Sequence, residues 1–191
     1  MKPVSFGFKR AHELGQAIAL MSEACGEARF LAGGQSLMPM LNLRLAQPKL
    51  LIDITGVEAL KKVAISGRHH HVGACITSSE IEDGLIEGMT GRYLSDVAAG
   101  IAYRGIRNQG TIGGSIAHAD PSADWPAALL GLSAVVVATG LTGERQIPIT
   151  EFYRSPFVSE LSDDELLTEV ILPVLSDEAR WGYYKVAPKL G

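Results

Sequence analysis

The sequence has few of the residues that mark several classes of protein. Only two of its 191 residues are cysteine, Cys25 and Cys75, and they form no C-x-x-C pair. A disulfide framework or an iron–sulfur cluster ligated within this chain is therefore not expected. No apolar run reaches the ~18 residues of a membrane span. Residues 1–6 also lack the apolar core of a signal peptide. These absences predict a cytoplasmic protein.

Neither sign of charge is in large excess. The formal net charge is −4, and no basic stripe runs along the chain. A nucleic-acid-binding surface is therefore not expected. The 47% hydrophobic content is ordinary for a globular protein, and 191 residues allow one domain or two small lobes.

Two common nucleotide fingerprints are missing. Gly105 and Gly110 have roughly the spacing of a Walker A loop, but Thr111 stands where the motif requires lysine. No G-x-G-x-x-G stretch lies between a strand-like run and a helix-like run. Any phosphate-bearing ligand would therefore be bound by a different fold.

Two glycine pairs are the most informative feature that is present. One lies in Ala32-Gly33-Gly34-Gln35-Ser36-Leu37 and the other in Thr111-Ile112-Gly113-Gly114-Ser115. Glycine lets the backbone approach a ligand closely, and successive N–H groups of such a turn converge into an anion site. One pair alone is typical of a tight turn. Two pairs with flanking hydroxyls predict one ligand held from two sides, such as a dinucleotide with a pyrophosphate.

Hydrophobic periodicity predicts helices and strands without a regular βαβ order, and hence an α+β fold. The expected helices are 10–25, 37–45, 93–101 and 122–132. The expected strands are 28–32, 49–54, 63–66, 70–75, 133–139, 144–148, 165–172 and 181–186, with a loop at 103–121. Thr77 and Glu80 have capping-box spacing, and Met38, Leu41 and Leu45 are expected to pack inward.

The glycine pairs, together with Asp120-Pro121-Ser122-Ala123-Asp124, resemble the flavin segments of a known family. It is the FAD-binding (medium) subunit of the molybdenum hydroxylases, of carbon monoxide dehydrogenase and xanthine dehydrogenase type. The resemblance runs from Phe6 to Lys185. It implies a two-lobed FAD-binding fold of the vanillyl-alcohol oxidase / p-cresol methylhydroxylase type, with FAD between the lobes. The implied division is residues 1–56 for lobe 1, 57–177 for lobe 2, and 178–191 for the start of a C-terminal domain that is mostly absent.

The same resemblance implies which residues bind FAD. The first stretch would hold one side of the pyrophosphate and the second the other. Asp124 would accept a hydrogen bond from a ribose or ribityl hydroxyl, and Lys185 would stabilise the reduced, anionic flavin. Gln35 and Ser115 depart from the histidine and asparagine that are common in the family, although both can still donate hydrogen bonds. The full set is Phe30, Leu31, Ala32, Gly33, Gly34, Gln35, Ser36, Leu37, Ile101, Thr111, Ile112, Gly113, Gly114, Ser115, Asp124, Leu167 and Lys185.

By resemblance, the chain is expected to be an oxidoreductase subunit that transfers electrons. Electrons would come from [2Fe–2S] clusters on a small partner subunit, after substrate oxidation at a molybdenum cofactor on a large one. They would leave through FAD to NAD or a quinone. No catalytic residue and no metal ligand is expected on this chain. The alternatives are an assembly subunit that has lost stable FAD binding, and a free-standing flavin oxidase.

Other patterns have a simpler interpretation. His118 and Asp120 form a metal-like pair, but no further ligands stand at suitable spacing. The run 69–71 is all histidine and is expected to begin a strand. No G-x-S-x-G elbow supports a hydrolase triad of serine, His118 and Asp124. Arg104 and Arg107 are expected to form salt bridges rather than a phosphate clamp.

Overall fold

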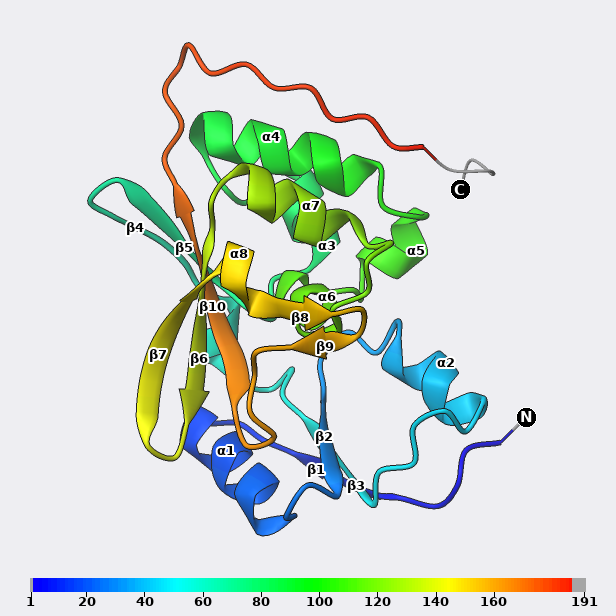
Figure 1. Cartoon of the computed structure of the whole chain (residues 1–191). Coiled ribbons are helices and arrows are strands. Elements are labelled where there is room, and N and C mark those ends of the chain that lie inside the picture. The colour runs from blue at the N-terminus through cyan, green and yellow to red at the C-terminus, as the bar shows by residue number, and fades with distance from the viewer. Residues whose placement is uncertain (1, 187–191) are drawn as a thin grey trace.

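A computed structural model describes residues 2–186 and has two main sheets (Figure 1). A three-stranded parallel sheet in the order β1-β3-β2 lies at the bottom of the view, and a five-stranded antiparallel sheet in the order β4-β5-β10-β6-β7 lies above it. The strands are β1 Gly7–Arg10, β2 Ala28–Leu31, β3 Leu50–Asp53, β4 Val63–Ser66, β5 His69–Gly73, β6 Val135–Gly140, β7 Gly143–Pro148, β8 Tyr153–Ser155, β9 Val158–Ser159 and β10 Leu166–Pro173. The helices are α1 Leu14–Glu23, α2 Leu37–Asn42, the 3₁₀ turn η1 Glu58–Lys61, α3 Ser78–Glu82, α4 Gly88–Ala99, α5 Arg104–Arg107, α6 Ile112–His118, α7 Asp124–Gly131 and α8 Ile149–Phe152. The α+β class is confirmed.

The parallel sheet contains a strand that the sequence pattern does not show. All four residues of β1 are exposed, so the strand lacks the apolar alternation that identifies a half-buried strand. It forms because Gly7–Arg10 pairs in parallel with Leu50–Asp53. The predicted helix 10–25 is therefore too long at its start, and α1 begins only at Leu14. It also ends early, at Glu23, and the turn that follows contains Cys25 at φ +48° and Gly26 at φ +83°.

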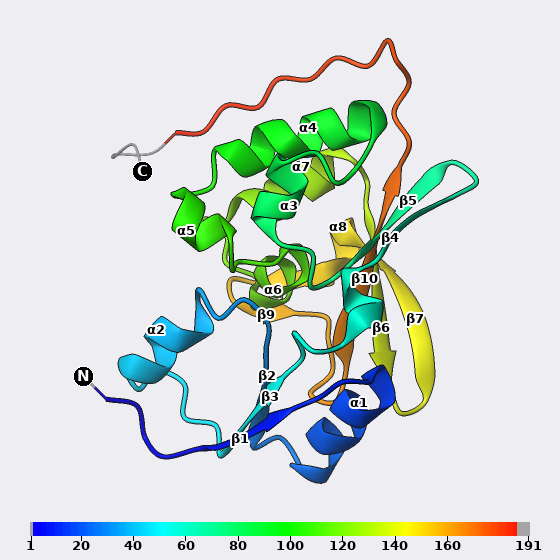
Figure 2. The ribbon, with the colours of Figure 1, turned by 180° about the vertical axis from the view of Figure 1, so that it is seen from behind.

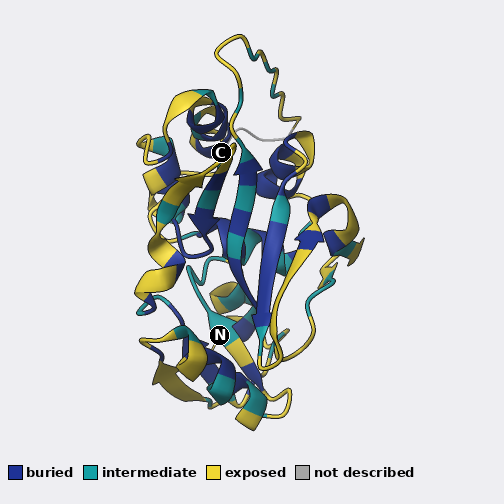
Figure 3. Cartoon of the chain, turned by 90° about the vertical axis from the view of Figure 1, so that its left-hand side faces the viewer, coloured by how far each residue is buried: buried dark blue, intermediate teal, exposed yellow. Residues whose placement is uncertain are grey.

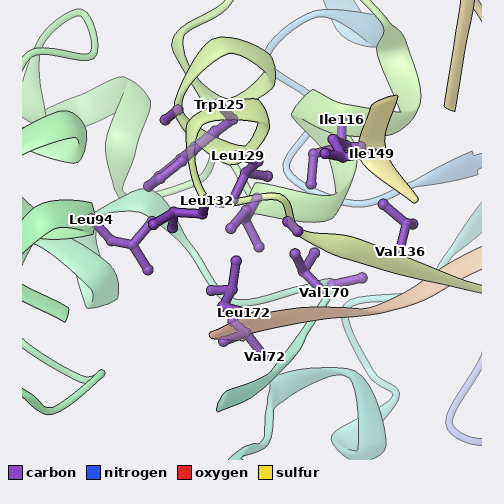
Figure 4. Close-up of a cluster of buried hydrophobic side chains, with 14 of the residues drawn as sticks. Val72, Leu94, Ile116, Trp125, Leu129, Leu132, Val136, Ile149, Val170 and Leu172 are labelled. Carbon is purple, nitrogen blue, oxygen red and sulfur yellow. The ribbon is translucent and has the colours of Figure 1, made fainter. Parts of the chain in front are cut away.

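The larger core lies between the five-stranded sheet and the helices that cover one of its faces. Figure 4 shows Val136, Val170 and Leu172 of the strands facing Trp125 and Leu129 of α7. Figure 3 shows the same strands as largely buried along their length. The Trp125 indole Nε1 donates to Ser78 Oγ at 3.1 Å, which satisfies the one polar group of the ring. This core supports the second glycine stretch, whose Ile112 and Ile116 side chains belong to it.

The two Gly-Gly stretches differ in secondary structure. The first is a turn between β2 and α2, as expected. The loop predicted at 103–121 is wrong, because it contains α5 and α6. Thr111 caps α6 by accepting a hydrogen bond from the Gly114 N–H at 3.1 Å, and the cap together with the packing of Gly113 on Ala74 offsets the poor helix propensity of the glycines.

The C-terminal part of the described chain differs from its prediction. The sequence pattern predicts a strand at 181–186, but these residues form none. They run as a tail along α4 at the top of Figure 1. Trp181 fixes the tail there, with its Nε1 donating to Asp96 Oδ2 at 2.9 Å and its ring 5.8 Å from that of Tyr93. This segment is therefore held by side-chain contacts with a helix and not by backbone pairing at a sheet edge.

Two local predictions have opposite outcomes. The capping box at α3 is confirmed, since Thr77 and Glu80 exchange both of its hydrogen bonds. The inward packing of the α2 segment is only partly confirmed. Leu41 is fully buried, whereas Met38 and Leu45 are 38% and 72% exposed. Ser36 occupies the cap position of α2, but its side chain makes no capping hydrogen bond.

Candidate functional site

The first glycine stretch lies at the carboxyl end of β2. Because β1, β3 and β2 are parallel, their carboxyl ends meet at one edge, which is where open α/β sheets bind ligands. Gly34 has φ +70°, in the region that favours glycine. The Gln35 side chain folds back, and its Nε2 donates to the Gly33 carbonyl at 2.9 Å. The amide of Gln35 therefore shapes the turn itself.

This turn carries a run of free backbone donors. Among residues 2–186, the N–H groups of Gly33–Leu37 donate to no protein acceptor. The next helical N–H groups are satisfied, with Met38 bonded to Gly34 and Met40 bonded to Ser36. No aspartate or glutamate occurs between residues 28 and 52. Successive unpaired N–H groups without a nearby acid fit a phosphate-bearing group such as a pyrophosphate.

The second glycine stretch is not a donor nest of this kind. The N–H groups of Ile112 and Gly113 are bonded to the carbonyls of Ile76 and Ala74 at 3.0 and 2.9 Å. A Cβ on Gly113 would lie 2.5 Å from the Ala74 Cβ, so this glycine permits close packing of α6 against the chain leaving β5. The sequence-based expectation of converging free N–H groups here is wrong. What this stretch presents is the partly exposed Gly114 and Ser115.

The two stretches touch each other directly. A Cβ on Gly33 would lie 2.0 Å from the carbonyl oxygen of Gln109, and a Cβ on Gly114 would lie 3.7 Å from the Cβ of Ala32. Almost eighty residues separate them in the sequence, so this contact brings the two predicted halves of the site together. Gln109 is the partner that the motif analysis did not identify. Its position directly before Gly110 and Thr111 is the sequence feature that indicates a place at this contact.

Arg107 links α5, which precedes the second stretch, to α3 and to the chain that follows α4. Its guanidinium binds both carboxylate oxygens of Glu82 at 2.7 and 2.9 Å and donates to the carbonyls of Ile101 and Ala102. The hydrogen bond from Arg107 is the main reason why the pKa of Glu82 lies below its usual value, and Arg104 adds to the effect. The expected salt bridges are therefore found. Arg107 is only 9% exposed, so its guanidinium stabilises contacts within the protein and is not available to bind a phosphate.

Asp124 and Lys185, predicted as separate site residues, form an ion pair. Lys185 Nζ lies 2.8 Å from Asp124 Oδ2, and the Tyr183 hydroxyl donates to Asp124 Oδ1 at 2.6 Å. Asp124 is buried at the start of α7, and the other two residues lie on the tail. Burial raises the pKa of Tyr183, and the hydrogen bond to the carboxylate raises it further. Tyr183 is a member of this cluster that lies outside the set of residues expected to bind the cofactor.

The other predicted residues fall into two groups. Phe30, Leu31, Leu37 and Ile101 are partly buried and flank the glycine stretches or the tail. Leu167 and Ile112 are 2% and 0% exposed and pack in the larger core, so their side chains present no surface to a ligand.

The alternative interpretations find little support in the described part of the chain. Within residues 2–186, no three histidine, cysteine or acidic side chains gather so as to hold a metal ion. The histidine run begins β5, as expected. Clefts of about 630 and 440 Å³ lie elsewhere, one between α4 and Trp181, the other between the outer sheet face and α1. None of the helices in this part of the chain has the length and apolarity needed to cross a membrane.

The two contacting glycine stretches, with free backbone donors at the carboxyl edge of a parallel sheet, define an α+β protein with a candidate site for a phosphate-bearing cofactor. Residues 4–175 match the family described as the FAD binding domain in molybdopterin dehydrogenase, and the chain belongs to that family. It is 42% identical, over 92% of its length, to the 6-hydroxypseudooxynicotine dehydrogenase complex subunit alpha of Paenarthrobacter nicotinovorans. It is 34% identical, over its whole length, to the carbon monoxide dehydrogenase medium chain of Hydrogenophaga pseudoflava.

Solved structures agree with this assignment. The carbon monoxide dehydrogenase of H. pseudoflava that lacks the Mo-pyranopterin moiety has a chain that superposes on all of this one, with a TM-score of 0.94 and 33% identity. Quinoline 2-oxidoreductase from Pseudomonas putida 86 gives a TM-score of 0.92 and 30% identity. The chain spans 59% of the length of the P. nicotinovorans relative and 67% of that of the H. pseudoflava medium chain.

Proposed function

We propose that this chain binds FAD between its two lobes and transfers electrons as a subunit of a molybdenum-containing hydroxylase or dehydrogenase. One observation carries the proposal. The turn Gly33–Leu37, whose N–H groups are free, lies against the second glycine stretch at the carboxyl edge of a parallel sheet. Family membership supplies the identity of the ligand. The proposed lobes are residues 1–56 and 57–177, since β3 ends at Asp53 and β4 begins at Val63.

The residues of the site would have distinct tasks. Gly33–Leu37 would donate to the pyrophosphate, while Thr111–Ser115 would close the site from the other lobe. Asp124 would accept from a ribose or ribityl hydroxyl, since its carboxylate has about four acceptor positions and the tail uses two. Lys185 would act as half of an ion pair and not as an isolated cation. Ile101 would contribute apolar contact, and Leu167 would act only by supporting the core.

The redox chemistry would be supplied by the cofactor, and this chain would bind and orient it. Electrons would arrive from [2Fe–2S] clusters of a small subunit and leave to NAD or a quinone, while substrate would be oxidised on a large subunit with the molybdenum cofactor. Relatives named as dehydrogenase subunits or chains support this division.

An absorption spectrum of the purified chain, followed by acid release of any flavin, tests the proposal. We expect a flavin spectrum and FAD in the extract. Gly34→Ala is expected to weaken retention by roughly 5- to 30-fold, because φ +70° costs a non-glycine residue about 1–2 kcal/mol and the strain distorts the turn at Gly33–Leu37. Gly67→Ala is the matched control, with φ +59° in the β4–β5 hairpin and no atom near its Cβ.

The outcomes separate the alternatives. Loss of FAD in Gly34→Ala but not in Gly67→Ala supports the site. A colourless wild-type chain that takes up no added FAD contradicts the proposal for this chain and favours the assembly-subunit alternative. Substrate oxidation by the chain alone, without iron or molybdenum, favours the free-standing oxidase.

A further inference from the structure

The outer face of the five-stranded sheet carries a cleft that the proposed function does not use. The cleft has a volume of about 440 Å³ and lies between this face and helix α1. Figures 1 and 2 both show α1 beside the ends of β6 and β7 that lie nearest the parallel sheet. Small-molecule sites typically measure about 300–1,000 Å³. We call it the outer-face cleft, and its lining includes His71, Val137, Gln146, Glu169 and Ile171.

Four neighbouring strands place these side chains in a row across the sheet. Ile171 of β10 pairs with His71 of β5. Glu169 of β10 pairs with Val137 of β6, and Val137 pairs in turn with Gln146 of β7. Residues directly opposite one another in antiparallel strands share a face, so the row alternates apolar and polar groups. Helix α1 and the turn η1 add further apolar side chains to the lining. An apolar lining with a few polar groups is typical of a small-molecule site.

His71 and Glu169 form a carboxylate–imidazole pair in the outer-face cleft. The Nδ1 atom of His71 lies 2.7 Å from Oε1 of Glu169. An ionised carboxylate can only accept, so Nδ1 carries the proton of this hydrogen bond. In the neutral ring, Nε2 is then an acceptor. Within residues 2–186, neither Nε2 of His71 nor Oε2 of Glu169 has a hydrogen-bond partner, so both atoms are free to accept from a ligand.

The remaining polar groups of the outer-face cleft also lack a free cation. The side chains of Glu144 and Gln146 make no hydrogen bond to the described part of the chain, and both line the cleft. Arg145 is already neutralised, because its guanidinium binds both carboxylate oxygens of Glu165 at 2.7 Å and donates to the carbonyl of Glu160. No lysine belongs to the lining. The cleft therefore offers mainly acceptors, two of them carboxylates.

This inventory selects among classes of ligand. An anion would meet two carboxylates without a free positive charge to balance them. A structural or catalytic metal ion usually takes three or more protein ligands. In residues 2–186, no three histidine, cysteine or acidic side chains gather in that way. A cation with several N–H donors matches the acceptors, and an apolar body matches the rest of the lining.

We propose that the outer-face cleft binds a small organic ammonium ion. Its N–H groups donate to Nε2 of His71 and to the carboxylates of Glu169 and Glu144. Its apolar body lies on Val137 and Ile171. Charge-assisted hydrogen bonds are roughly twice as strong as neutral ones, so the positive charge is what distinguishes this ligand from a neutral molecule of the same shape. The inference goes beyond the proposed function and does not depend on flavin binding.

The first test titrates the purified chain with phenethylammonium and measures binding by saturation-transfer NMR of the ligand. We expect saturable binding with a Kd of roughly 1 mM, as for a ligand of this size. 2-Phenylethanol has the same shape without the charge and should bind at least about tenfold more weakly. Phenylacetate carries the opposite charge and should not bind. The ¹⁵N resonance of His71 Nε2, assigned by its loss in His71→Asn, should shift only with the cation.

Substitution of the carboxylates locates the site. Glu169→Gln preserves the shape of the side chain and removes its charge, so we expect phenethylammonium to bind about tenfold more weakly. Glu144→Gln should weaken binding about three- to tenfold. Glu151→Gln is the matched control, because Glu151 is exposed on α8, away from the cleft, and its loss changes the net charge by the same amount. It is expected to leave the Kd unchanged, and thermal melts check that all three variants fold.

The outcomes decide the proposal. Cation-selective binding that is weakened in Glu169→Gln but not in Glu151→Gln supports it. Absence of binding by the wild-type chain overturns it, as does equal binding of the three probes. Equal weakening in Glu169→Gln and the control assigns the effect to overall charge and also overturns it. Binding by the chain alone but not by the complex that co-purifies with it assigns the acceptors to a cationic side chain of a partner, which overturns the small-molecule site.

Discussion

Lys185 and Asp124 join the C-terminal tail to the start of α7, with Nζ and Oδ2 2.8 Å apart. Tyr183 completes the cluster by donating to the other oxygen of the same carboxylate at 2.6 Å. The cluster places two candidate cofactor residues and a tyrosine at one point, although about sixty residues separate Asp124 from the tail. Because both contacts use the Asp124 carboxylate, one substitution at this residue weakens the attachment of the tail to α7 at two points.

Asp124→Asn is expected to loosen the tail. The amide removes the charge that attracts Lys185 and weakens the hydrogen bond from Tyr183. Hydrogen exchange at residues 176–186 should speed up, while exchange in α4 stays unchanged. Lys185→Ala should have a smaller effect, because its side chain is 41% exposed and such pairs contribute only about 0.2–1 kcal/mol. Equal protection of the tail in Asp124→Asn and wild type would show that Trp181 alone holds it.

Tyr183 is expected to ionise well above the usual tyrosine range. Burial raises its pKa, and the Asp124 carboxylate adds to this by accepting the hydroxyl hydrogen bond and by repelling a phenolate. Ultraviolet difference titration of wild type and Tyr183→Phe isolates this ring. Asp124→Asn should bring its pKa part of the way back. An unchanged titration in that variant would leave burial as the only cause.

Gly33→Ala is expected to separate the two glycine stretches. The new Cβ would lie 2.0 Å from the backbone oxygen of Gln109, which cannot move aside as a flexible side chain can. A forced contact of this kind costs about 1–3 kcal/mol of unfolding free energy. Urea denaturation measures the loss, and FAD content should fall with it.

The control for that substitution is Gly15→Ala in α1. No atom lies within 4 Å of the Cβ that alanine would add. The change replaces a poor helix former with a good one and should raise the free energy of unfolding by up to about 1 kcal/mol. Equal stability of Gly33→Ala and wild type would mean that the two stretches are not packed together in solution.

Asp53→Asn is expected to remove part of the pH dependence of stability. Burial by itself raises the pKa of Asp53, but hydrogen bonds from Thr55 and Arg10 outweigh it, so the pKa is lowered on folding. A lowered pKa stabilises the fold above the unfolded value of about 3.9 and loses that effect as pH falls through the folded value. At neutral pH the variant should be about 1–3 kcal/mol less stable than wild type.

The pH at which this difference disappears provides the check. Urea midpoints of wild type and Asp53→Asn should differ by a constant amount above pH ~5, draw together once the pH falls below ~4, where the unfolded carboxyl takes up its proton, and coincide only below the lowered pKa of the folded state. A difference that persists unchanged in acid would assign the effect to packing rather than to the charge that pairs with Arg10.

Local sequence patterns determined much of this protein. The apolar stripe of α1, the capping box of α3 and the hairpin strands β4–β5 and β6–β7 follow from neighbours in the chain, whose periodicity and turn residues act over a few positions. The α+β class and the family follow from the same order of elements and from the glycine pairs. The turn with free N–H groups at Gly33–Leu37 also follows from the sequence, because Gly34 has a positive φ that glycine adopts more readily than other residues.

Only the tertiary structure decided the rest. Strand β1 exists because of its pairing with β3, and the tail stays out of both sheets because Trp181, Tyr183 and Lys185 find partners on α4, α7 and the residue that follows α4. Identical glycine pairs became a turn in one place and a helix in the other, because Thr111 caps the second and Ala74 packs against Gly113. These outcomes depend on residues far apart in the chain, and a local pattern carries no information on which distant groups will meet.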